Sequence, residues 1–299
     1  MQSDEPVRGR TGLLPLRDRI FVVVTAAALL VGALLVQRPM VDEDAEVAAA
    51  EIVPEPVAHD EPLPDFSAFR DAREKKQAFF DYLRPMVEAH NQRLLEERES
   101  VQSLAEALTK DGRLTPAQQE TLAELAERYR IDVAPGEEQR AIELLLQRVD
   151  IIPVSLALIQ SANESGWGTS RFAREANNLF GEKCFRKGCG IAPAQRPGAV
   201  EYARFDRPDD AVASYMHNLN THPAYRDFRK LRSRLRERDE PLTGPVLADG
   251  LHRYSERGKQ YVQELRGMIW RNKLQRLDEA SSSSAEATDR QATPLARRR

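Results

Sequence analysis

The chain has 299 residues, which is enough for one or two domains rather than several. Hydrophobic residues make up 41% of the chain and charged residues 30%, a balance typical of a globular protein with polar extensions. The formal net charge of -3 gives no overall positive field, which argues against a nucleic-acid partner. The two cysteines and five scattered histidines form no HExxH or CxxC motif, so the sequence predicts neither a metal site nor a cofactor.

Residues 20–36 form an uncharged apolar run of 17 residues. The run is long enough to cross a bilayer and longer than the apolar part of most cleaved signal peptides, although a cleaved signal is the alternative. Four arginines precede it and an acidic stretch follows it, so residues 1–19 are expected to be cytoplasmic. We therefore predict a single-pass inner-membrane protein whose remaining chain lies in the bacterial periplasm. Because that compartment is oxidising, Cys184 and Cys189 are expected to form a disulfide rather than to remain free thiols.

Polar and helical segments follow the predicted anchor. Residues 37–65 are acidic and proline-rich, which is typical of a semi-extended linker. Residues 66–135 carry apolar side chains at three- and four-residue steps, which predicts helices with a kink or break at Pro85 and a new N-cap at Thr115. We expect these helices to pack against the next domain rather than to dimerise. Residues 278–299 form a low-complexity tail that is predicted to be disordered.

The main domain is predicted at residues 136–277. Apolar residues follow a helical period on both sides of Pro153, whereas residues 200–205 (VEYARF) favour a strand. Helical patterns return at residues 209–219 and from 247 to 274. The predicted fold class is mostly α: an α+β domain with a small β element, preceded by a helical segment and an N-terminal transmembrane helix.

The strongest functional signal is the stretch PVSLALIQSANESGWGTSRFAREANNLFG at residues 153–181. Pro153 begins an apolar helix, and Gly166 and Gly168 end it because glycine readily adopts the left-handed conformation. Glu164 then lies in the last turn, where the negative end of the helix dipole and apolar neighbours both raise the pKa of a carboxyl group. A carboxylic acid that stays protonated near neutral pH can protonate a glycosidic oxygen. From spacing alone, an exposed glutamate at a helix end is the alternative.

The motif AxESxWGxSxxA, followed by NNLFG, resembles the glucosaminidase domain of glycoside hydrolase family 73, and in particular its Bax-type members from Gram-negative bacteria. The resemblance extends roughly over residues 66–274. It is carried by residues 75–91, 161–168, Ser170, 177–181, Cys184, Cys189, 202–215, 218–229 and 254–265. It implies a lysozyme-like fold and an endo-β-N-acetylglucosaminidase that hydrolyses the glycan strands of peptidoglycan. Glu164 occupies the position of the family's general acid.

The resemblance leaves the second catalytic group open. Longer family members have a second acidic residue in a hairpin after the NNLFG motif. The nearest candidate here is Glu201, for which an exposed strand residue is the alternative, and Asp206 is a weaker candidate. Neighbouring-group help from the substrate's N-acetyl group would remove the need for a second carboxylate. Tyr254 is similar to the tyrosine of the family's YATDPxY motif, from which the following residues depart, and it is predicted either to assist catalysis or to pack in the core.

Five further residues are predicted to bind substrate: Trp167, Asn178, Phe180, Tyr202 and Tyr261. For Trp167, packing beside the glycines that end the helix is the stronger alternative. Asn178 is expected to stabilise its turn by bonding to backbone amides.

Three other functions remain open from the sequence. A lytic transglycosylase would use a single glutamate after an apolar helix and would leave an anhydro ring on its product. A non-catalytic module would bind peptidoglycan without cutting it. A membrane-tethered coiled-coil adaptor built on residues 66–132 would form a stable dimer, although the sequence itself predicts no oligomeric state.

Overall fold

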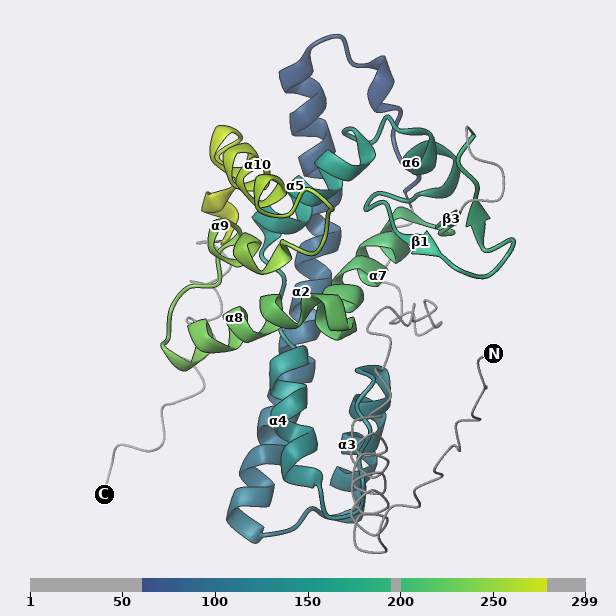
Figure 1. Ribbon diagram of the computed structural model, residues 1–299. Coiled ribbons are helices and arrows are strands. Elements are labelled where there is room, and N and C mark those ends of the chain that lie inside the picture. Colours follow the sequence, from purple (N-terminus) through teal and green to yellow (C-terminus); the bar gives the residue numbers. More distant parts are fainter. Residues whose placement is uncertain (1–60, 195–199, 279–299) are drawn as a thin grey trace, which may run out of the picture. The chain divides into compact units, whose positions relative to one another are not determined.

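The computed structural model describes residues 61–194 and 200–278 (Figure 1). The predicted cytoplasmic segment, the apolar run at residues 20–36, and residues 279–299 of the predicted disordered tail lie outside these residues. Asp278, with which that tail was predicted to begin, is instead ordered and only 3% exposed. Among the helices that are described, none combines the length and the apolar character needed to cross a membrane.

A helix of 40 residues, α2 (Ala72–Asp111), forms one side of the structure and follows the short helix η1 (Phe66–Ala68). Asp71 caps its start by accepting hydrogen bonds from the first backbone amides. The predicted break at Pro85 is not observed, because α2 continues through this residue. Pro85 has no N–H to donate to the carbonyl of Asp81, one turn earlier. Both residues are exposed, so water can donate to that carbonyl instead.

Two shorter helices, α3 (Pro116–Arg128) and α4 (Glu138–Arg148), pack against α2 and against each other. The predicted N-cap at Thr115 is confirmed. Its hydroxyl accepts a hydrogen bond from the amide of Gln118, and the Gln118 side chain accepts one in return from the amide of Thr115. The predicted packing of this segment on the main domain is also confirmed, since α2 contacts both α4 and α5.

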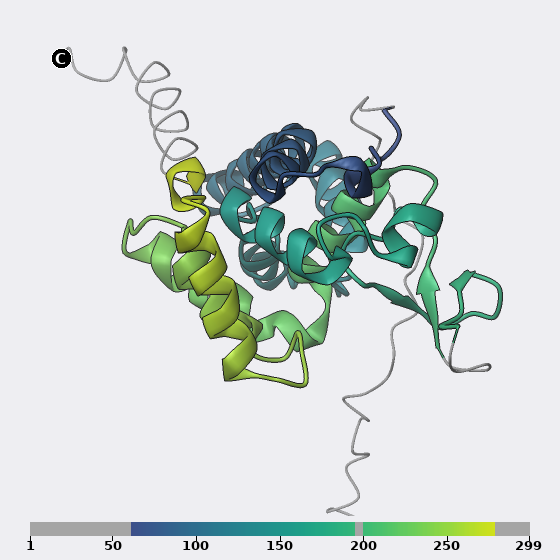
Figure 2. The same ribbon diagram turned by 90° about the horizontal axis from the view of Figure 1, so that it is seen from above.

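The central helix is α5 (Val154–Ser165). Ten of its twelve residues are buried, and only Asn163 and Glu164 remain partly exposed. It ends at Gly166, which has a left-handed φ of 59°, as predicted. Helices α2, α9 (Gly244–Leu247) and α10 (Lys259–Arg271) pack around it. Figure 2 shows α5 between α2 and α10, with the small sheet on the side away from α10.

The chain continues through α6 (Arg171–Ala176) into a three-stranded antiparallel sheet. The strands are β1 (Lys183–Cys184), β2 (Gly190–Ile191) and β3 (Glu201–Ala203). The strand predicted near residues 200–205 is therefore present, and it lies in the middle: Tyr202 pairs with Lys183 on one side and with Ile191 on the other.

The last part of the fold is helical. Its elements are α7 (Pro208–Thr221), η2 (Pro223–Tyr225), α8 (Arg226–Glu237), α9, η3 (Ala248–Leu251) and α10. The helical pattern expected from residue 247 to residue 274 is interrupted between η3 and α10, where Gly258 adopts a φ of 51°. The sequence did not predict α8. Its buried face includes Arg232, which is 1% exposed and donates to carbonyl groups of residues 147, 148, 150 and 151.

The described residues share one hydrophobic core, which contains side chains from both sides of residue 136. The packing therefore shows no break at the predicted domain boundary, and the division at that residue stays a prediction. A mostly helical chain with one small sheet fits the predicted α-rich, lysozyme-like α+β fold.

Candidate active site

Glu164 is held at the end of a buried chain of hydrogen bonds. The Tyr261 hydroxyl donates to Oε1 of Glu164 over 2.8 Å. Nε2 of Gln160 donates to the Tyr261 oxygen over 3.1 Å, and Oε1 of Gln160 accepts from the Tyr215 hydroxyl at 2.6 Å. Gln160, Tyr215 and Tyr261 are at most 1% exposed. The chain therefore fixes the orientation of a carboxyl group that itself reaches the surface.

Burial raises the pKa of Glu164 above its ordinary value, and this effect outweighs the groups that oppose it. Hydrogen bonds from Tyr261 and Asn163 favour the charged form and lower the pKa, as does the positive charge of Arg257. The negative charge of Glu264 raises it, although Glu264 is paired with Arg257 at 2.7 Å. Sequence reasoning identified Glu164 but missed Gln160, Arg257 and Glu264.

The NNLFG segment runs directly past this carboxyl group. Gly181 has a φ of 69°, and a Cβ atom at that position would lie 3.6 Å from Oε2 of Glu164. Both donors that contact Glu164, Tyr261 and Asn163, bind Oε1. Among the described residues, no donor is bound to Oε2. A proton on the carboxyl group is therefore best placed on Oε2, because Oε1 acts as the acceptor.

Glu182 follows Gly181 and is a second carboxyl group that the sequence reasoning missed. Its Oε2 accepts a hydrogen bond from the Ser214 hydroxyl at 2.9 Å, while its Oε1 is fully enclosed without a hydrogen-bond partner among the described residues. Burial raises the pKa of Glu182 to about 7. The only signal in the sequence was an acidic residue directly after NNLFG, which does not by itself distinguish a buried side chain from an exposed one.

The structure gives Glu201 a role in the hairpin. Its two carboxylate oxygens accept hydrogen bonds from the amides of Gly188 (3.1 Å) and Gly190 (2.9 Å). No hydrogen bond joins Glu201 to Glu164 within the described residues. The predicted catalytic role of Glu201 stays a prediction that this geometry does not favour. Asp206, the weaker candidate, is exposed at the start of α7.

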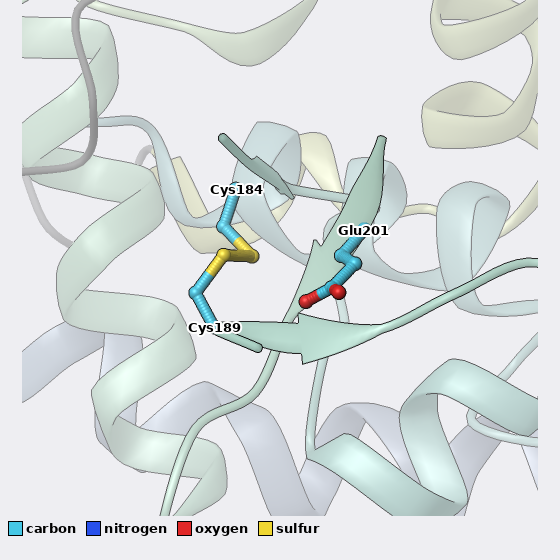
Figure 3. A group of neighbouring side chains, drawn as sticks. All are labelled: Cys184, Cys189 and Glu201. Carbon is cyan, nitrogen blue, oxygen red and sulfur yellow. A yellow bond between two sulfur atoms is a disulfide. The ribbon is translucent and has the colours of Figure 1, made fainter. Parts of the chain in front are cut away.

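Cys184 and Cys189 form a disulfide, in agreement with the pairing expected from the sequence. Figure 3 shows the disulfide beside the Glu201 carboxylate. The two sulfur atoms and one carboxylate oxygen lie within 4.8 Å of one another, a spacing that would suit a metal ion. A disulfide sulfur is not a thiolate, however, and thiolate is the form of cysteine that binds metals. In the oxidised state these three residues therefore do not fit a metal centre.

Three of the predicted substrate-binding side chains are used in packing instead. Trp167 lies against the rings of Phe79 and Phe80 on α2, with ring centroids 6.0 and 5.4 Å apart. Asn178 is 1% exposed, and its side chain bonds to backbone groups of residues 182 and 203, which confirms the expected stabilisation of the turn. Phe180 is 2% exposed and stacks on Tyr215. For Asn178 and Phe180, burial corrects the predicted contact with a sugar.

The three predicted tyrosines differ in exposure and in what they contact. Tyr261 is fully buried, so its ring cannot form a sugar platform, but its hydroxyl contacts Glu164 directly. Tyr254 stacks parallel to Tyr261 and donates its hydroxyl to the carbonyl of Phe180 over 3.0 Å. Tyr202 is partly exposed on β3, where it stacks on Phe172 at 4.0 Å. Of these three, Tyr202 has the ring that is best placed to meet a sugar.

A cavity of about 510 Å³ lies between the first half of α2 and the chain after α10, and two of its lining residues, Lys76 and Phe80, contact Trp167. Its basic lining residues are Arg73, Lys76, Arg84, Arg271, Lys273 and Arg276, and its acidic one is Asp81. None of the predicted site residues lines it. We therefore place the candidate site at Glu164 on the chemistry of its side chains rather than in this cavity.

Comparisons with known proteins identify the family. Residues 139–274 match a family model described as mannosyl-glycoprotein endo-beta-N-acetylglucosaminidase. Over 210 residues the chain is 37% identical to Protein bax of Escherichia coli (strain K12), covering 70% of this chain and 74% of that protein. The chain belongs to the Bax-type family of glucosaminidase-domain proteins. No solved structure matches it.

Membership of the Bax-type family suggests a glycosidase role, but it does not identify the catalytic residue. The matched glucosaminidase region begins with α4 and ends just after α10. It therefore includes Glu164, Glu182 and Tyr261, whereas all of α2 precedes it. In this family member, α2 supplies one wall around α5 from outside the region that the glucosaminidase model describes.

Proposed function

We propose that this protein is an endo-β-N-acetylglucosaminidase that cleaves peptidoglycan glycan strands, with Glu164 as the general acid. One observation carries the proposal: Glu164 is a partly exposed carboxyl group at the end of an otherwise buried helix, and burial raises its pKa. The protonated acid is the form needed to donate to a leaving glycosidic oxygen. The Glu164 proton on Oε2 would transfer to that oxygen while Tyr261 holds Oε1 in place.

The second half of the reaction requires either a carboxylate or the substrate's own acetamido group. Because Glu201 is bonded to two amides of its hairpin, we favour assistance by the N-acetyl carbonyl of the substrate. The acetamido oxygen would attack the anomeric carbon as the glycosidic bond breaks, and water would then open the ring that forms. The same geometry supports the second candidate, a lytic transglycosylase, in which a hydroxyl group of the sugar takes the place of water.

The experiment compares products from purified peptidoglycan. The wild-type protein is expected to release fragments with reducing N-acetylglucosamine ends, and mass spectrometry separates these from anhydro products. Glu164→Gln should lower the rate at least about 100-fold, because general acid catalysis contributes about 10²–10⁴. Glu175→Gln, which changes an exposed ion-paired glutamate on α6, is the matched control and should retain the rate. Full hydrolysis by Glu164→Gln, or glycan binding without cleavage by the wild type, would contradict the proposal.

We also propose that residues 20–36 anchor the chain in the inner membrane, with the described residues in the periplasm. The uncharged run and the arginines before it support this topology. Protease added to intact spheroplasts should digest the described part of the chain and leave a membrane-bound N-terminal fragment. Recovery of the whole protein in the soluble fraction would contradict the anchor.

A further inference from the structure

Four arginines and two histidines lie close together where α3, α4, α7 and α8 meet. Few unpaired carboxylates lie near them. The cationic cluster consists of Arg130, Arg148, Arg226, Arg229, His217 and His222. The positive charge of Arg130 adds to burial in lowering the pKa values of Arg148, His217 and His222. Burial first, and neighbouring arginines second, lower the pKa of Arg229 to about 9 and that of His217 to about 4. Contacts confirm that the segments lie together: Arg148 binds the carbonyl of Arg130, and Arg229 binds that of His222. Like charges at such close range repel one another.

Two of the arginines have a structural task. Arg148 donates to the backbone carbonyls of residues 129 and 130, just after α3. Arg229 donates to the carbonyls of Leu219 and His222, at the end of α7. These bonds satisfy carbonyls at helix C-termini, where a positive charge is favourable. They fix both guanidinium groups without neutralising them, because a carbonyl carries no net charge.

The other side chains of the cationic cluster have hydrogen-bond donors that could bind a ligand. Arg226 is exposed and Arg130 partly exposed, and neither side chain makes a hydrogen bond or an ion pair within the described residues. Nδ1 of His222 accepts a hydrogen bond from the Ala224 amide, so the neutral ring carries its hydrogen on Nε2. Nε2 of His217 is enclosed and has no partner among the described residues.

The acidic groups around the cationic cluster do not balance it. Glu97 is already bound by Arg128 and by the Tyr129 hydroxyl. Asp227, on the first turn of α8, lies 3.5 Å from His252. Asp132 is exposed and affects the cluster only through its charge on Arg148. An anion from outside the chain would therefore relieve the repulsion.

A row of aromatic rings connects the cationic cluster to Glu164. The ring centroid of His222 lies 5.7 Å from that of Tyr225, which lies 5.8 Å from Tyr254. Tyr254 stacks on Tyr261 at 5.6 Å, and the Tyr261 hydroxyl binds Glu164. The negative charge of Glu164 also raises the pKa of Tyr225, after burial and the charge of Glu182. Packed aromatic rings, of which Tyr261 is fully buried, thus link the cationic cluster to the candidate active site through η2.

We propose that Arg130, Arg226 and His222 form a subsite for the free carboxylates of the peptides that peptidoglycan strands carry on their muramic acid residues. This inference rests on the proposed function, because it names the part of the same substrate that lies beyond the sugar at Glu164. Guanidinium groups bind carboxylates with two parallel hydrogen bonds, and the histidine Nε2–H supplies a further donor. The subsite makes the enzyme selective for peptide-bearing glycan over bare glycan.

The first test measures kcat/KM of the full-length protein on peptidoglycan and on the same strands after an amidase has removed the peptides. The wild type should favour the peptide-bearing strands. In the double variant Arg130→Gln with Arg226→Gln, the ratio of the two values should fall about tenfold, since a hydrogen bond to a charged group contributes enough for such a factor. Arg113→Gln, at an exposed site between α2 and α3, should keep the wild-type ratio. An unchanged ratio in the double variant, or an equal fall in Arg113→Gln, overturns the subsite.

The second test does not depend on catalysis. N-acetylmuramyl-L-alanyl-D-glutamate, which has two free carboxylates, and its diamide are titrated into the protein while the histidine ring resonances are followed by NMR. The carboxylate form should shift the His222 signals and bind at least about tenfold more tightly than the diamide. Equal binding of the two probes overturns the subsite. If the wild type cuts neither glycan while discrimination between the probes persists, the proposed hydrolase activity fails and the subsite stands.

Discussion

Glu182 makes the stability of the protein depend on pH in a direction opposite to that of most carboxylates. Its pKa is raised from an ordinary 4.5 to about 7 because its carboxyl group is enclosed and only Ser214 donates to it. A carboxyl group whose pKa is raised by folding favours the folded state while it is protonated. Its contribution is fully present below pH 4.5 and is lost as the pH rises through about 7.

The size of the effect follows from the shift. Each pKa unit corresponds to about 1.4 kcal/mol, so the rise to about 7 corresponds to about 3 kcal/mol lost between pH 4.5 and pH 8. Glu182→Gln keeps the size of the side chain and an oxygen that can accept from Ser214, but it removes the titration. As the pH rises, the free energy of unfolding of the variant should therefore increase relative to that of the wild type, by about 3 kcal/mol at the alkaline end of the range.

The assay is urea denaturation at five pH values between 5 and 9, with the disulfide intact. The difference in the free energy of unfolding between Glu182→Gln and wild type should change by about 3 kcal/mol over this range, with its midpoint near pH 6 to 7. Glu175→Gln serves as the control because Glu175 is exposed, and its difference from wild type should stay flat. A flat difference for Glu182→Gln as well would refute the assignment of the raised pKa to its enclosed carboxyl group.

Three other predictions concern the contacts around α5 and the hairpin. Tyr261→Phe removes a hydrogen bond that favours ionised Glu164, so the pKa of Glu164 should rise. The alkaline limb of the plot of kcat/KM against pH should then move to higher pH. An unmoved limb would count against the contact. The double variant Cys184→Ser with Cys189→Ser should lose about 2 kcal/mol of stability in urea denaturation, the value for a short closed loop, and reduction of the wild type should give the same loss. Asp278→Ala should lower the free energy of unfolding by about 2–4 kcal/mol, because its buried carboxylate accepts three hydrogen bonds; a loss below about 1 kcal/mol would show that water replaces them.

Local rules were sufficient to predict the helix that carries the site. Its start at Pro153, its glycine stop and the position of Glu164 in the last turn all follow from helix propensities and caps. The cap at Thr115 was predictable for the same reason. Helix α8 was not predicted, although its apolar residues Phe228, Leu231 and Leu235 fall at three- and four-residue steps. Its pattern does not reveal that Arg232 is buried, where backbone carbonyls about 80 positions earlier and the Asp150 carboxylate at 3.9 Å surround it. No pattern within α8 itself contains that information.

The same limit applies to the side chains of the site. A sequence shows that Phe180 and Tyr261 are aromatic, but burial decides whether an aromatic ring meets a sugar or the core, and burial depends on α7 and α10. Likewise, Glu201 and Glu182 are two glutamates near a hairpin. Only the fold shows that the first is bound by backbone amides and the second is enclosed. Resemblance to a family could direct attention to the hairpin but not choose between them.

Helix α5 is fixed at both ends by parts of the chain that lie far from it in sequence. At its start, Asp278 accepts hydrogen bonds from the amide and hydroxyl of Ser155, which satisfies donors that Pro153 cannot cap. At its other end, Tyr261 on α10 binds Glu164. Because every residue between these ends except Asn163 is buried, small movements of α5 would disturb the core before they displaced the carboxyl group. The precision of the candidate site therefore comes from the C-terminal part of the chain, which holds α5 at the point where it begins and at the point where its acid meets the surface.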